Sequence, residues 1–167
     1  MGGIINAINR LIEAVKALTI SVGDHQKLLF VAKGSTTSVP ASAHTPIVFT
    51  TEQLDIEGTW NGTRFTCAES GWYNFFGAAT ISQLEDTKKI IVSIIKNGDY
   101  AFATGNNKLI GRATVGGTDI CGIGGGATMY LNAGDYIELC LFHNNAAGAT
   151  VMNAMADMTH FSGYRMF

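Results

Sequence analysis

Charged side chains are scarce in this 167-residue sequence. Asp, Glu, Lys and Arg make up 14% of the residues and apolar residues 47%, whereas roughly a quarter of an average soluble domain is charged. No apolar run approaches the ~20 residues needed to cross a bilayer, so the sequence predicts no membrane insertion. We therefore expect another subunit to cover the excess apolar surface, which makes oligomerisation the first inference.

Concentrated positive charge and targeting signals are also missing. The net charge is −2 and the Lys and Arg residues are scattered singly. No basic stripe is available to neutralise phosphates, so no nucleic acid is expected as a partner. The first six residues lack the basic and long apolar regions of a secretory signal peptide. Asn6 stands where an N-myristoylation signal needs Ser or Thr.

The cysteine and histidine residues show no metal-site spacing. The cysteines are odd in number and widely spaced, which favours buried reduced thiols over a disulfide framework or a zinc knuckle. The histidines form no His-x-x-x-His pair, so a metal ion would need ligands from across the fold or a ring of His side chains on a symmetry axis. No metal site is therefore predicted. The residues are Cys67, Cys121, Cys140, His25, His44, His143 and His160.

Motifs for catalysis are absent as well. There is no Gly-x-Ser-x-Gly nucleophile elbow. The neighbouring carboxylates Asp55/Glu57 and Glu85/Asp86 have the surroundings of solvated turn residues. We predict that the protein is not an enzyme, with no catalytic residue and no cofactor.

A glycine-rich segment over residues 122–127 matches the pattern Gly-x-Gly-x-x-Ala. In a dinucleotide site this pattern lies between a strand and a helix. Residues 128–131 are typical of a strand instead, and the Lys-Ser/Thr end of a P-loop is missing. We expect a flexible loop here, or a close approach of backbones near a symmetry axis.

Helical periodicity is confined to the N-terminus, where we predict a helix over residues 1–23. The segment is marginal as an isolated helix, so we expect it to trimerise the chain or attach it to a particle. A second, Ile-rich seam through Ile5 and Ile12 overlaps the first seam. The first seam favours a dimer and the second a trimer, so the helix alone leaves open how many helices associate in the coiled coil. The first coiled-coil seam consists of Ile4, Ile8, Leu11, Val15, Leu18 and Val22.

From residue 24 to residue 167 the pattern changes to short β-type runs broken by Gly, Asn, Asp and Pro. Asn97-Gly98 is a strong type I′ hairpin signal, and Asn132–Asp135 is typical of a second turn. Residues 33–46 are interpreted as a loop. The predicted strands cover residues 28–31, 47–49, 64–67, 72–81, 89–96, 100–102, 127–131, 136–143 and 159–166. So many short strands predict one all-β domain, a sandwich or jelly roll.

Four blocks of the sequence, taken in order, resemble the C1q domain family. They are Arg64–Phe75, with Phe-Thr-Cys, a glycine and an aromatic run; Ile95–Gly98, a hairpin; Leu131–Leu139, with a Gly-Asp pair; and Phe161–Tyr164, a terminal Phe-Ser-Gly-Tyr. The likeness covers residues 28–167. It implies a C1q/TNF-like, ten-stranded jelly roll that forms a homotrimer with apolar and aromatic faces buried between subunits.

Individual residues in these blocks lead to further expectations. Gly71 and Gly134 are expected in tight turns that need a positive φ. Some C1q relatives hold calcium near the threefold axis. The match of Asp119, Asp135 and Glu138 to such ligands is too loose to predict a site.

The function expected from the resemblance depends on where the chain departs from the family. Animal members usually carry a secretion signal and a collagen stalk, whereas this sequence shows a short coil, which resembles the tip of a bacteriophage fibre or spike. We expect a virion structural protein, a fibre, spike or tail-tip head exposed on the particle. It would bind a host-surface glycan or protein and attach to other virion proteins through its N-terminal helix. The alternatives are a cellular C1q/TNF-like ligand that clusters a protein receptor and a capsid decoration without receptor binding.

Overall fold

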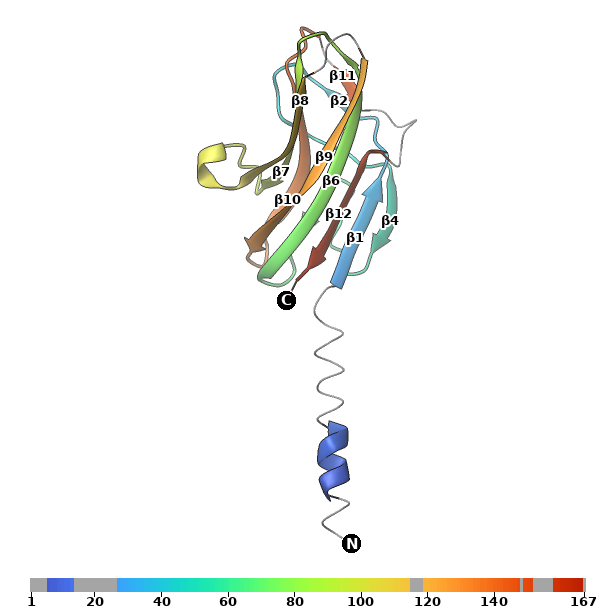
Figure 1. The fold of residues 1–167 in the computed structure, drawn as a ribbon, viewed down its shortest axis with the longest axis vertical. Helices are drawn as coiled ribbons and strands as arrows, with labels where there is room; N and C mark the ends of the chain where they lie inside the picture. Colours follow the sequence, from blue (N-terminus) through green and yellow to red (C-terminus); the bar gives the residue numbers. More distant parts are fainter. Residues whose placement is uncertain (1–5, 14–26, 115–118, 148, 152–157, 167) are drawn as a thin grey trace.

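The computed structural model describes residues 6–13, 27–114, 119–147, 149–151 and 158–166, and its head is a two-layer β-sandwich (Figure 1). One layer is a seven-stranded sheet in the order β2-β11-β6-β12-β1-β4, with β9 along the other edge of β6. The other layer is a five-stranded sheet in the order β3-β10-β7-β8, with β5 beside β10. All of these pairings are antiparallel, and the predicted all-β sandwich is confirmed.

The seven-stranded sheet contains β1 (Lys27–Lys33), β2 (Ser38–Val39), β4 (Thr51–Asp55), β6 (Gly71–Leu84), β9 (Asp119–Leu131), β11 (Ala149–Val151) and β12 (His160–Arg165). The five-stranded sheet contains β3 (Thr45–Pro46), β5 (Arg64–Thr66), β7 (Lys89–Lys96), β8 (Asn107–Thr114) and β10 (Tyr136–His143). A short 3-10 turn, η1 (Phe102–Thr104), separates β7 from β8. Without the two-residue strands β2 and β3, the twelve strands of the described part become ten, in agreement with the expected jelly roll.

The strands β7 and β10 begin and end at the predicted residues. The strand predicted over residues 47–49 is wrong. Residues 47–49 do not form a ladder, because the N–H of Ile47 donates to Leu139 O at 2.9 Å whereas the N–H of Phe49 donates to Gly62 O at 2.8 Å, on a different segment. The loop expected over residues 33–46 contains the short strands β2 and β3.

The connection between β7 and β8 is longer than predicted. Asn97 and Gly98 have φ values of 53° and 67°, as a type I′ turn requires, and the turn is confirmed. Residues 100–102 are nevertheless not a strand, because the chain passes through η1 before β8 begins at Asn107. This detour is held by side-chain amides: Asn106 Nδ2 donates to Asp99 Oδ2 at 3.0 Å and Asn107 Nδ2 donates to Tyr100 O at 2.8 Å.

The core is built around aromatic rings between the two sheets. The Phe30 ring lies 4.8 Å from Trp60, 5.2 Å from Phe65 and 5.1 Å from Phe161, measured between centroids. Trp60 is 6% exposed and therefore belongs to the core. The inward face of β6 contributes to this core. Its buried members are Tyr73, Phe75, Gly77, Ala79 and Ile81.

The glycine-rich segment is not a loop: residues 122–126 lie within β9. A Cβ on Gly125 would lie 2.3 Å from the carbonyl oxygen of Ile110, and a Cβ on Gly111 would lie 2.5 Å from Ile123 Cγ1. The close backbone approach expected here therefore exists, but it joins β9 of one sheet to β8 of the other sheet in the same chain. It closes this edge of the sandwich.

The two turn glycines behave differently. Gly134 has a φ of 88°, as predicted, and lies in the turn between β9 and β10. Gly71 is the first residue of β6 and does not adopt a positive φ, so this prediction is wrong. An extended φ is available to any residue at that position.

The N-terminal helix is described only over residues 6–13. Ile8 and Leu11 lie on it and are 51% and 65% exposed. The predicted boundary after residue 23 lies outside the described residues, so the coiled coil remains a prediction. The other members of the predicted seam also lie outside them: Ile4, Val15, Leu18 and Val22. Among the described residues, no helix has the length and apolar character needed to cross a bilayer.

We predict that Gly125→Ala destabilises the head by about 1–3 kcal/mol, because the new methyl group must push β8 away from β9. The backbone oxygen of Ile110 cannot rotate aside as a side chain would. Thr51→Ala, at an exposed position of the edge strand β4, is the control. Chemical unfolding of both variants provides the measurement, and equal stabilities would contradict the proposed seam between the sheets.

Candidate subunit interface

The outward side of β6, β9 and β12 forms one continuous surface of the seven-stranded sheet, where these strands lie side by side (Figure 1). Side chains alternate between the two sides of a strand, so the inward set defines the outward one. We call this surface the uncharged face, because it carries no Asp, Glu, Lys or Arg. Its members are Trp72, Asn74, Phe76, Ala78, Thr80, Ile120, Gly122, Gly124, Gly126, Thr128, Tyr130, His160, Ser162 and Tyr164.

One half of the uncharged face is aromatic. Trp72 and Tyr130 are cross-strand partners, and their rings meet edge to face at 5.7 Å and 76°. Phe76 stacks with Tyr164 of β12 at 6.2 Å and 22°. Trp72, Phe76 and Tyr130 remain 49%, 44% and 47% exposed. A contiguous apolar surface of this kind marks a contact site on a soluble protein.

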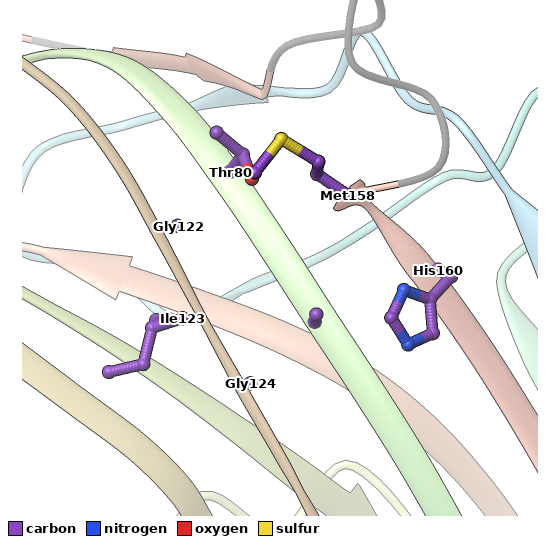
Figure 2. A pocket seen from close by; sticks show the side chains of 7 residues that line it. Thr80, Gly122, Ile123, Gly124, Met158 and His160 are labelled. Atoms are coloured by element: carbon purple, nitrogen blue, oxygen red, sulfur yellow. The ribbon is translucent and has the colours of Figure 1, made fainter.

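The other half of the uncharged face is hollow. Gly122 and Gly124 of β9 oppose Thr80 and Ala78 of β6, so this part of the sheet has almost no side-chain bulk. Figure 2 shows the bare ribbon at both glycines. The hollow has a volume of about 370 Å³. Its lining consists of Ala78, Thr80, Gly122, Ile123, Gly124, Met158 and His160.

Two polar atoms on the outward side of β6 lack hydrogen-bond partners within the described part of the chain. They are Asn74 Oδ1 and Thr80 Oγ1, and both are inaccessible to solvent. An unpaired buried polar atom costs about 1–3 kcal/mol.

Two of the three carboxylates considered for calcium, Asp135 and Glu138, are engaged with cations of the same chain. Asp135 forms an ion pair with Lys96 at 2.6 Å and accepts a hydrogen bond from Asn97 Nδ2 at 2.7 Å. Glu138 is buried and pairs with Arg64 at 3.0 Å. Asp119 is the first residue of β9. In the parts of the chain that the structure describes, no group of three or more His, Cys, Asp or Glu residues is arranged to hold a metal ion.

The histidines lie apart from one another. His143 is fully buried. Its Nε2 lies 2.9 Å from Val39 O, and its Nδ1 accepts the N–H of Asn145 at 3.2 Å. His44 packs against the rings of Tyr100 and Phe142. His160 lines the hollow, and His25 lies outside the described residues.

The three cysteines are free and buried, as predicted. Burial raises the pKa of the Cys140 thiol and also that of Cys67. Both thiols stay protonated at neutral pH, whereas a nucleophilic cysteine needs a lowered pKa.

One carboxylate of each neighbouring acidic pair, Asp55 and Glu85, has a structural role. Asp55 ends β4 rather than lying in a solvated turn, and its two oxygens accept the N–H groups of Thr59 and Trp60, each at 3.1 Å. Glu85 lies in the turn between β6 and β7, where it accepts the N–H of Ala146 at 3.0 Å. These contacts tie loops to strand ends.

With this geometry established, comparison with known proteins identifies the fold. The family model described as the C1q domain matches residues 29–166. The chain belongs to the C1q domain family. The predicted resemblance is thereby confirmed at the level of the family.

Solved structures support the same C1q fold. The globular domain of zebrafish complement 1qA has a TM-score of 0.58 at 15% identity, with 84% of this chain and 98% of that chain covered. Murine APRIL gives a TM-score of 0.56 at 15% identity over 85% and 99% of the two chains. The Eiger TNF of S. frugiperda gives 0.51 at 12% identity over 84% and 92%. A comparison with curated proteins gives no match.

Sequence reasoning missed the uncharged face on β9. Every second residue from Ile120 to Tyr130 belongs to the outward side of β9. Three of these residues, at 122, 124 and 126, are glycines, so the alternation of apolar side chains is interrupted there. The continuing alternation on either side of the glycines was the available signal.

We predict that Asp135 makes the stability of the head depend on pH. Burial alone would raise its pKa, but hydrogen bonds from Lys96, Asn97 and the Asn132 N–H outweigh burial and lower the pKa to about 2. The unfolded chain, with a pKa of about 3.9, binds the proton first as pH falls. The contribution of Asp135, about 1–2 kcal/mol, is therefore complete above pH 4 and is lost between about pH 4 and 2.

Unfolding curves measured from pH 6 to pH 2 test this prediction. Asp135→Asn should flatten the pH dependence in that window and lower stability at pH 6. Glu52→Gln, which removes an exposed carboxylate on β4, is the control. A wild-type slope in Asp135→Asn would contradict the prediction.

Proposed function

We propose that this C1q domain protein assembles as a homotrimer through its uncharged face. Proteins with the C1q/TNF fold are typically trimeric and ligand-like. The observation that carries the proposal for this chain is the absence of charge across a surface that exposes Trp72, Phe76 and Tyr130. Burial of that surface between copies accounts for the low charge content of the whole sequence.

The distribution of charge over the two sheets supports this orientation. The outward side of the five-stranded sheet carries Lys89 on β7 and Arg112 on β8. Lys89 Nζ lies 5.7 Å from the ring centre of Phe142, and the Arg64 guanidinium lies 4.2 Å from that of Tyr136. Polar contacts of this kind suit solvent or a ligand, so this side is left outermost in the trimer.

We further propose that the trimer is the head of a bacteriophage fibre, spike or tail tip. In this proposal it binds a host-surface glycan or protein by shape and polar loops, without covalent chemistry. The exposed Ile8 and Leu11 support a role for the helix in trimerising the chain or docking it to other virion proteins. In this proposal the head is exposed on the surface of the virion.

Light scattering should give a mass near three times 17.8 kDa, about 53 kDa. We predict that Phe76→Asp yields a folded monomer, because a carboxylate in the buried interface loses its hydration without gaining a partner. Val48→Asp replaces a side chain of similar exposure, 52% against 44%, away from the uncharged face and should remain trimeric. A monomeric wild-type chain at micromolar concentration would contradict the proposal.

The virion role is tested with particles and cells. Antibody labelling of purified particles should place the protein on the virion, and the purified trimer should bind host cells in a saturable manner. Labelled particles without cell binding would favour a capsid decoration. Absence from the particle, combined with binding to a protein receptor, would favour the cellular ligand.

A further inference from the structure

The outward side of the five-stranded sheet carries a second, smaller buried patch. Glu138, Ile95 and Asn107 are cross-strand partners in one row, and Cys140 and Ser93 are partners in the next row. These five residues, which we call the outer patch, are at most 5% exposed. Ser93, Ile95 and Cys140 alternate along their strands with residues of the central core, so they face away from it. The cover of the outer patch is therefore not the opposite sheet.

The connection between β7 and β8 supplies this cover. We call residues 99–106 the strap; it includes η1, which stands out from the side of the sandwich (Figure 1). Tyr100 reaches back to the outer patch, where its hydroxyl group shares a hydrogen bond with the Cys140 thiol. Asn107 Nδ2 donates to Tyr100 O at 2.8 Å, and the Tyr100 ring stacks on His44 at 5.4 Å. Tyr100 therefore anchors the strap over the patch.

The two ends of the strap are tied to each other and to β7. Asn106 Nδ2 donates to Asp99 Oδ2 at 3.0 Å. The N–H of Asp99 donates to Lys96 O at 3.0 Å, and the N–H of Lys96 donates to Asn106 O at 2.9 Å. Gly105, with a φ of 75°, stands just before the second end and gives the chain freedom to turn there. Because these bonds close the base, Tyr100 can leave the sheet without separating β7 from β8.

Two polar atoms of the outer patch have no hydrogen-bond partner among the described residues. They are Ser93 Oγ and Asn107 Oδ1. Buried polar groups are nearly always paired, and an unpaired one costs free energy. When Tyr100 moves away, water reaches both atoms and pairs them, whereas the burial of Ile95 and Cys140 is lost. These effects oppose each other, so the closed strap is held by a small margin.

The thiols of the chain report on the two kinds of opening. Burial raises the pKa of the Cys140 thiol, and the charge of Glu138 raises it further. A thiol that is buried and protonated does not react with alkylating reagents until it becomes exposed. Cys67 belongs to the central core. Cys140 therefore reports opening of the strap, and Cys67 reports unfolding of the sandwich.

We propose that the strap opens and closes while the sandwich stays folded, and that opening exposes Cys140 and pairs Ser93 Oγ and Asn107 Oδ1 with water. The strap then controls what this side of the five-stranded sheet presents. Tyr100 covers the sheet in the closed state, and Ile95 becomes accessible in the open state. Local opening of this kind is typical of surface segments with few buried contacts. The inference does not depend on the proposed trimer, because the uncharged face belongs to the other sheet.

Alkylation of the wild-type chain with iodoacetamide, followed by mass spectrometry of its peptides, gives the reaction rate of each cysteine. Cys140 should react at least about tenfold faster than Cys67, because local opening is more frequent than unfolding. Low concentrations of urea should accelerate the reaction of Cys67 strongly and that of Cys140 only slightly, because opening of the strap exposes little surface. Equal rates with the same dependence on urea would overturn the inference.

Two conservative variants should change the rate of Cys140 in opposite directions. Tyr100→Phe keeps the ring on His44 but removes the hydroxyl group bonded to Cys140, so alkylation should accelerate by roughly 2- to 12-fold, the range expected for one hydrogen bond. Ser93→Ala removes an unpaired atom from the closed patch and should slow the reaction by about fivefold or more. Thr114→Ala, at an exposed position of β8, is the control and should leave the rate unchanged. An unchanged rate in Tyr100→Phe, or an unchanged or faster rate in Ser93→Ala, would overturn the inference.

Discussion

The two-residue period of β6 is the constraint on which the rest of this structure depends. Its odd-numbered residues, Tyr73 to Ile81, fill the core between the sheets, and its even-numbered residues, Trp72 to Thr80, form the centre of the uncharged face. The same strand is bonded to β9 along one edge and to β12 and β11 along the other. A slip of one residue would place Trp72 and Phe76 inside and Phe75 outside, so core packing and the outer surface are specified together.

Sequence reasoning located the strands whose apolar runs end at strong turn signals. β7 runs directly into Asn97-Gly98, and β10 follows the turn at Asn132–Asp135, so their bounds could be predicted to the residue. β4 was missed because an edge strand needs little apolar content, and Thr51–Asp55 contains a single aliphatic side chain. β9 was missed in part because glycine has low strand propensity. Its strand conformation comes from pairing with β6 along most of its length, which is tertiary information.

The sequence predicted a contact surface between subunits but not its position on the fold. The charge deficit predicted a buried surface between subunits, yet composition alone does not assign that surface to one sheet. Its hollow half joins Thr80 of β6, Gly122 of β9 and His160 of β12, which are distant in sequence and adjacent only in the folded sheet. The unpaired hydroxyl of Thr80 is a property of packing, so no sequence pattern could have indicated it.

The two edges of the seven-stranded sheet differ in how strongly they oppose association with another chain. The β4 edge is short and carries Glu52 and Asp55, charges that discourage pairing with another chain. β9, the strand beside β6 on the other edge, is 13 residues long and has no charged residue from Ile120 to Leu131. At Gly125 the strand β8 packs against the inward side of β9. This contact blocks association with another chain on the inward side of β9 only. Nothing in the sequence of β9 opposes association on its outward side. In the proposed trimer, a neighbouring copy seated there would prevent unspecific pairing and would also bury the aromatic rings.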